Sequence, residues 1–134
     1  MLHRINIQTE SRVEFQNITS RVEAAVVQSN INNGICHVTT LHTTTGITIN
    51  ENADPDVVTD LISWLDSVAP QLARYRHREG NSPAHIKASI VGSSATIVIE
   101  NSRLLLGTWQ GIFFCEFDGP RNRTVFIRCI ADNP

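Results

Sequence analysis

The stretch ICHVTTLHTTTGITIN, residues 35–50, is rich in β-branched side chains and decides the class of fold. Ile, Val and Thr favour strands, so this stretch predicts two extended segments. Gly46 interrupts the run, and a glycine inside a strand pattern indicates a bend or a bulge. Unbroken alternation would place four polar residues on one face of the strand: His42, Thr44, Thr48 and Asn50. A bulge at Gly46 would break that register.

Further strand patterns lie on both sides of this stretch. Residues 2–8 alternate in polarity, and residues 11–18 are placed to form their hairpin partner. The C-terminal third predicts more strands, separated by turns rich in Gly, Asn, Ser and Asp, at residues 85–92, 96–100, 108–117 and 123–131.

Two helices are predicted between the strands. Ser20 and Glu23 have the spacing of a capping box at the start of the first helix. The second begins in NADPDVVTDLISWLDSVAP, where Asp54 is a good N-cap and Pro55 stands at the first helical position. The sequence therefore predicts one α+β domain over residues 1–134, mainly antiparallel, with two helices.

Composition narrows the possible partners. The chain has 134 residues, of which 41% are hydrophobic, as expected for one globular domain. A net charge of -2 argues against nucleic acid as a partner, because phosphate backbones require a concentrated basic surface. With 6% aromatic residues, a base-stacking platform is also poorly supported.

Cysteine usage and hydropathy indicate the compartment. The three cysteines, Cys36, Cys115 and Cys129, form no CxxC pair and do not suggest a disulfide framework. The first residues contain no apolar signal segment, and no apolar run is long enough to span a membrane. We therefore expect a cytoplasmic protein without a membrane partner.

Three of the five histidines lie in polar contexts suited to chemistry: His42, His77 and His85. His42 lies in the Thr-rich stretch, His77 in a polar loop, and His85 at the start of a predicted strand. Imidazole is the commonest neutral metal ligand, and three imidazoles with an open fourth position suit a divalent ion such as zinc. Their spacing matches no short metal motif, so unrelated histidines that hydrogen-bond locally are the alternative.

Polar residues between a strand and a helix start form a second candidate, in the segment Asn50-Glu51-Asn52-Ala53-Asp54. Helix N-termini attract anions, and Glu51 could transfer a proton or orient a histidine. For Asp54 we favour plain helix capping, and for Glu51 both interpretations stay open.

Two further segments could form the walls of a binding site. Arg121 and Arg123 stand beside the tight turn that begins at Asp118 and could grip a phosphate, although a solvated hairpin turn is the alternative. Lys87 would share a strand face with His85. In residues 108–117, Gln110 and Glu116 face together and suggest a polar pocket wall, with a bend around a core Trp as the alternative.

The runs LHTTTGITINENADPDV, HREGNSPAHIKAS and LLLGTWQGIFFCEFDGPR together resemble the YjbQ-like family, often labelled secondary thiamine-phosphate synthase. The resemblance spans most of the chain. It implies a β-sandwich of about seven strands with two helices, assembled as a homotrimer. It also implies that the three histidines are metal ligands in a cleft, and that further residues match the family pattern: Glu51, Asn52, Asp54, Gln110, Glu116 and Arg121.

The resemblance implies an activity, the joining of a pyrimidine-methyl pyrophosphate to a thiazole phosphate with release of pyrophosphate. Such chemistry uses anion-binding groups and a divalent cation; zinc is favoured here, and magnesium would suit a pyrophosphate substrate. Our hypothesis is a metal-dependent enzyme on a small phosphorylated molecule, with the histidines on the metal and Glu51 or Glu116 as proton-transfer group. Substrate would be bound by Asn52, Lys87, Gln110 and Arg121. The rival hypothesis is a trimer that binds a metal or small ligand without turnover.

One pattern in the last third also favours assembly. Ile112 and Phe114 interrupt the polar strand face that carries Gln110 and Glu116, and a second apolar strand surface needs cover. A symmetry mate would supply that cover in a closed ring. A helix of the same chain is the alternative.

Overall fold

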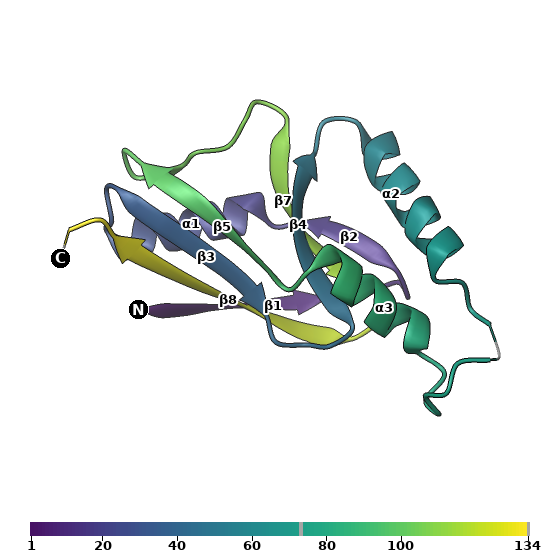
Figure 1. Ribbon diagram of the computed structural model, residues 1–134. Helices are drawn as coiled ribbons and strands as arrows, with labels where there is room; N and C mark the ends of the chain where they lie inside the picture. Colours follow the sequence, from purple (N-terminus) through teal and green to yellow (C-terminus); the bar gives the residue numbers. More distant parts are fainter. Residues whose placement is uncertain (73, 134) are drawn as a thin grey trace.

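Two antiparallel sheets face each other in the computed structural model, which describes residues 1–72 and 74–133 (Figure 1). The described part contains eight strands and three helices: β1 (Leu2–Gln8), β2 (Glu14–Asn17), α1 (Thr19–Ser29), β3 (Gly34–Thr40), β4 (Thr45–Glu51), α2 (Pro55–Val68), α3 (Ser82–Val91), β5 (Ser94–Glu100), β6 (Arg103–Leu104), β7 (Gln110–Glu116) and β8 (Asn122–Ala131). The larger sheet has the order β1-β8-β3-β5-β6 and the smaller one β2-β7-β4. The predicted α+β fold is confirmed.

The main core fills the space between the two sheets. Alternation along each strand buries one face of the larger sheet, for example Val38 and Ile127, against the smaller sheet and α1. From the smaller sheet, Ile47, Ile112 and Phe114 enter this core and are almost completely buried. Ile112 and Phe114 are therefore covered within one chain, and the argument that they need a symmetry mate is wrong.

A third layer covers the outer face of the smaller sheet. Leu65 of α2 and Ala88 of α3 pack there on the alternate residues of β7, chiefly Phe113 and Cys115. In Figure 1, α2 and α3 lie together beside β2, β7 and β4, away from the larger sheet. Among the described residues, no helix is long and apolar enough to cross a membrane.

The strand predicted at residues 85–92 is wrong, because residues 82–91 form α3. Ile86 and Ile90 are exposed, whereas Ala84 and Ala88 recur at helical spacing and are buried. Pro83 in the first turn also suits a helix start.

Two local pairings also differ from prediction. The segment after β1 does not form a hairpin with it, since β2 pairs with β7 of the other sheet. The capping box at Ser20 and Glu23 is not formed, because α1 begins at Thr19, whose backbone N–H donates to Asn17 Oδ1 at 3.0 Å. At α2 the prediction is confirmed: Asp54 is the N-cap and accepts from the Asp56 N–H at 2.9 Å.

Gly46 serves close packing and forms no bulge. It lies in regular register with β7, where it pairs with Cys115. A Cβ atom at this position would lie 2.8 Å from Val91 Cγ1 and 2.9 Å from the Gly92 carbonyl oxygen. The glycine therefore lets the end of α3 approach β4. The Thr-rich stretch changes sheet before Gly46, at residues 41–44, and this crossing carries His42.

Candidate functional site

A pocket of about 380 Å³ opens where three connections meet: β3–β4, the segment before α3, and β7–β8. Its walls include all three histidines singled out from the sequence, together with charged and amide side chains. The lining residues are Leu41, His42, Thr43, Thr44, His77, Glu79, Asn81, His85, Asp118, Arg121 and Arg123. We call this the histidine pocket.

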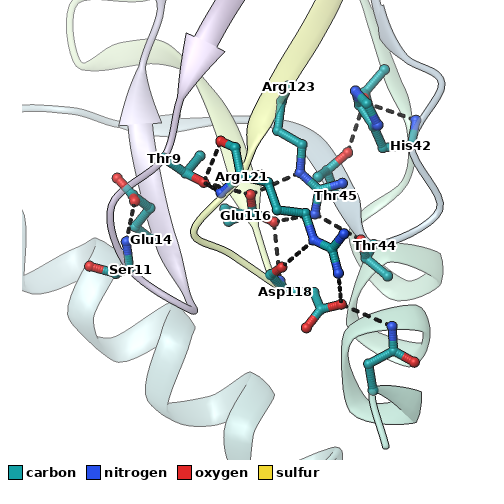
Figure 2. A network of polar contacts seen from close by, with 12 residues as sticks. Thr9, Ser11, Glu14, His42, Thr44, Thr45, Glu116, Asp118, Arg121 and Arg123 are labelled. Atoms are coloured by element: carbon teal, nitrogen blue, oxygen red, sulfur yellow. Dashed lines mark hydrogen bonds and ion pairs between the residues drawn. The ribbon is translucent and has the colours of Figure 1, made fainter. Parts of the chain in front are cut away.

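A buried ion pair joins Arg123, in the wall of the histidine pocket, to Glu116 beneath it, and Figure 2 shows its polar contacts. Arg123 donates from Nε to Glu116 Oε1 at 2.9 Å and from Nη2 to Glu116 Oε2 at 2.6 Å. The carboxylate of Glu116 is 0% exposed and also accepts from Thr9 Oγ1 and from the Asp118 N–H. Because its oxygens are fully engaged, Glu116 positions Arg123 and does not itself line the pocket.

Arg121 is held at the rim by Asp118. Its Nε donates to the Asp118 carbonyl at 2.8 Å, and its Nη2 lies 3.1 Å from Asp118 Oδ2. The same carboxylate oxygen accepts from Asn81 Nδ2 at 2.9 Å. The Arg121 side chain is 55% exposed, so its guanidinium can offer further donors to a ligand.

Asp118 and Asn81 were not predicted as site residues. Asp118 begins the turn that was singled out for its arginines, and Asn81 lies in the polar loop before His85. Asp and Asn are common in turns and helix caps, so their residue types alone did not indicate a site. The signal that could have found them was their position in the sequence close to Arg121 and His85.

His42 is a neutral, oriented imidazole. The backbone N–H of Thr124 donates to His42 Nε2 at 3.1 Å, which places the ring proton on Nδ1. Burial lowers the pKa of His42 below 6.5, and the Arg123 and Arg121 guanidinium groups lower it further, while Glu116 acts in the opposite direction. The ring is therefore neutral at neutral pH, and its proton on Nδ1 is the donor that it can offer.

His77 and His85 form an edge-to-face pair, with ring centres 5.2 Å apart and planes at 89°. Two imidazoles that bind one tetrahedral zinc through bonds of about 2 Å have ring centres about 5 Å apart. The pair therefore fits an ion, although the same separation is ordinary for two stacked rings. His42 does not complete the set as oriented, because its Nε2 lone pair is already engaged.

Across residues 1–72 and 74–133, no three side chains of His, Cys, Asp or Glu are grouped so as to hold a metal. The three-histidine metal centre stays a prediction, for which the structure offers two suitable ligands.

The predicted Glu51, Asn52 and Gln110 lie elsewhere. In the β4–β7 ladder Thr45 pairs with Glu116 beside the pocket, whereas Glu51 pairs with Gln110 six residues further along. Six strand residues span about 20 Å. These three residues form a separate cluster, in which the Asn52 N–H donates to the Trp109 carbonyl at 2.9 Å and Gln110 Oε1 accepts from the Gly107 N–H at 2.8 Å.

Lys87 does not share a face with His85, as predicted for a strand. On α3 the two residues point about 200° apart. The Lys87 side chain is 6% exposed and forms an ion pair with Asp66 of α2, beside a different cavity that includes Arg12 and Gln71.

The fold and pocket define a class: a two-sheet α+β domain that presents histidines and arginines at a connection between its sheets. The chain matches the family described as "UPF0047 protein YjbQ-like" over residues 3–132. It is 51% identical to the UPF0047 protein YugU of Bacillus subtilis, over 98% of this chain and 100% of that protein. It is 49% identical to a UPF0047 protein of Methanocaldococcus jannaschii, over 98% and 96%.

Solved structures agree. A YjbQ/UPF0047 family protein of Clostridium acetobutylicum is 53% identical, with a TM-score of 0.94 over 96% of this chain and 99% of that one. A YbjQ-like protein of Sulfolobus solfataricus, at 29% identity, has a TM-score of 0.94 over 98% and 97%. The chain belongs to the UPF0047 family of YjbQ-like proteins.

Proposed function

We propose that the chain is a metal-assisted enzyme that acts on a small phosphorylated molecule in the histidine pocket. One observation carries this proposal: His42, His77, His85, Arg121 and Arg123 converge on a single cavity. Arginine and imidazole donors are suited to phosphate oxygens. The pocket lies at the surface, so a small ligand can reach it.

The charge balance of the pocket supports a role for a cation. Glu116 and Asp118 form ion pairs with Arg123 and Arg121, so neither arginine contributes an unbalanced charge. A divalent ion held by His77 and His85 would supply the missing positive charge and stabilise a phosphate or pyrophosphate leaving group. Zinc is favoured by imidazole ligands, and magnesium would arrive with a pyrophosphate substrate.

Each residue of the pocket has a separate proposed role in binding. Arg121 donates to phosphate oxygens from the rim, and Asp118 together with Asn81 fixes its position. Arg123 forms part of the pocket floor, where Glu116 holds its guanidinium in place. His42 donates a hydrogen bond from Nδ1. The family resemblance supports thiamine-phosphate synthase chemistry as the reaction, in which a pyrimidine-methyl pyrophosphate joins a thiazole phosphate.

A homotrimer is part of the proposal and rests on the family resemblance. Glu51, Asn52 and Gln110 cannot reach the pocket of their own chain across about 20 Å of strand. They would contact substrate only at the pocket of a neighbouring copy, with Glu51 as the proton-transfer group. Light scattering at low micromolar concentration tests assembly: a mass near 14.9 kDa would refute the trimer. Free, buried cysteines accord with a cytoplasmic enzyme.

Turnover tests the proposed function. The protein, loaded with zinc or magnesium, is incubated with pyrimidine-methyl pyrophosphate and thiazole phosphate, and released pyrophosphate is measured. The wild-type protein should release pyrophosphate, and Arg121→Gln should lower the rate of release at least about tenfold. Arg128 is exposed on the outer face of the larger sheet, so Arg128→Gln should match the wild-type rate.

A non-catalytic ligand-binding protein is the second candidate. It is favoured by Glu116, the predicted proton-transfer group closest to the pocket, whose oxygens are fully engaged in the ion pair. Tight phosphate binding without turnover of any phosphorylated substrate would support it.

A further inference from the structure

A second cavity adjoins the histidine pocket and shares four of its residues, Leu41, His42, Thr43 and His85. Its volume is about 690 Å³. The remaining lining residues come from the ends of β3 and α3 and the start of β4: Thr40, Thr45, Ala88, Ser89, Gly92 and Ser93. None of the described residues that line it is Asp, Glu, Lys or Arg. We call this cavity the neutral lobe.

Helix α3 runs past both cavities and gives them different electrostatics. Its N-terminal end, with Asn81 and His85, faces the histidine pocket, and its C-terminal part, with Ser89 and Gly92, faces the neutral lobe. Backbone amides make the N-terminal end of a helix favourable for anions, and carbonyls make the C-terminal end unfavourable for them. A phosphate is therefore favoured in the histidine pocket and disfavoured in the lobe.

Ser89 presents a hydrogen-bond acceptor to the neutral lobe. Ser89 Oγ donates its proton to the His85 carbonyl at 2.9 Å, which leaves its lone pairs for a ligand. The hydroxyls of Thr40 and Thr45 bond to each other at 2.7 Å, and both residues are buried, so they close the base of the lobe. A ligand group that carries an O–H or N–H donor matches the Ser89 acceptor, whereas an anion does not.

The spacing of these residues sets the size of the ligand. His85 borders both cavities, and Ser89 lies one helical turn beyond it, about 6 Å along α3. That length accommodates one five- or six-membered ring. From these features we propose that the site takes a phosphate ester whose phosphate lies in the histidine pocket and whose uncharged, hydroxyl- or amino-bearing ring occupies the neutral lobe. The inference rests on the proposed function and names its substrate class and a specificity residue, Ser89.

Calorimetric titration with three probes tests this assignment: inorganic phosphate, ribose 5-phosphate, and cyclopentylmethyl phosphate, whose ring lacks hydroxyls. Ribose 5-phosphate should bind at least about tenfold more tightly than either other probe, because only its ring supplies donors to the lobe. Ser89→Leu, which fills the lobe at an exposed helix position, should remove this advantage and change phosphate affinity less than about twofold. Ile90→Leu, exposed outside the lobe, is the matched control.

Ser89→Ala removes only the hydroxyl, and alanine favours a helix, so this variant should fold. Its affinity for ribose 5-phosphate should fall about three- to tenfold, while its affinity for the other two probes stays unchanged. Phosphate binding without preference for ribose 5-phosphate would overturn the neutral lobe and leave the proposed function standing. Equal affinity for the two ring probes would overturn the hydrogen-bonding role. Absence of binding by all three probes would overturn both.

Discussion

Replacement of Glu116 by Gln should destabilise the fold strongly, because the carboxylate balances a guanidinium in the interior. Glu116 is 0% exposed and the Arg123 side chain 6% exposed. Removal of one partner from a buried pair leaves an uncompensated charge and costs about 3–5 kcal/mol. For a chain of this length such a loss lowers the melting temperature by roughly 10–20 °C.

Removal of both charges should cost much less. In Glu116→Leu combined with Arg123→Met, the desolvation penalty of both ions disappears. The hydrogen bonds of Thr9 and Asp118 to Glu116 are then lost, at about 1 kcal/mol each. We expect the double variant to lose about 1–2 kcal/mol, less than either single variant, with a coupling energy of at least about 2 kcal/mol.

Urea unfolding followed by circular dichroism measures these free energies in wild type, Glu116→Gln, Glu116→Leu, Arg123→Met and the double variant Glu116→Leu/Arg123→Met. Arg121→Gln is the control, because it removes an exposed partner of Asp118 and should cost no more than about 1 kcal/mol. A loss below about 1 kcal/mol for Glu116→Gln would contradict a desolvated ion pair, since it would mean that water reaches the two side chains.

Three further predictions concern His42, Gly46 and Asp54. Histidine NMR should show a titration midpoint for His42 below 6.5, and this midpoint should rise in Arg121→Gln. In the wild-type protein the lowered pKa means that the folded state binds fewer protons than the unfolded state, so the contribution of His42 to stability is present above pH 6.5 and is lost on acidification. A midpoint at or above 6.5 would contradict this. Gly46→Ala should cost about 1–3 kcal/mol in urea unfolding, because its Cβ would lie 2.8 Å from Val91 Cγ1, and an unchanged midpoint would show that α3 moves aside freely. Asp54→Ala should cost about 1 kcal/mol through the lost α2 cap, whereas Asp54→Asn should cost little, and equal losses would point to charge instead of capping.

Local signals were sufficient for part of the fold. Asp54 and Pro55 marked the start of α2 because an N-cap and a first-turn proline act within one helical turn. Alternation along residues 2–8 and the turn-bounded pattern of residues 123–131 each predicted a strand, and these strands pair as β1 and β8. In α3 the helical pattern was hard to recognise, because the small side chains of Ala84 and Ala88 occupy buried positions while the larger Ile86 and Ile90 are exposed.

The arrangement of the site could not be predicted from the sequence, because it depends on contacts between residues far apart in the chain. The histidines were recognisable as residue types, yet only the crossing of residues 41–44 between sheets brings His42 to His77 and His85. The antiparallel β4–β7 register separates Glu51 from Glu116, although both had been considered for one role. Burial decided the role of Glu116, since its saturation by Arg123 depends on contacts across the fold.

A two-dimensional amide NMR titration with inorganic phosphate, with and without zinc, tests the claim that the histidine pocket binds phosphate. Saturable shifts should be confined to residues 41–45, 77–85 and 118–124, which surround the pocket. Arg121→Gln should weaken these shifts by about tenfold in apparent affinity. Absence of saturable shifts, or shifts centred on residues 51–52 and 108–110 at the far end of the β4–β7 ladder, would contradict the claim.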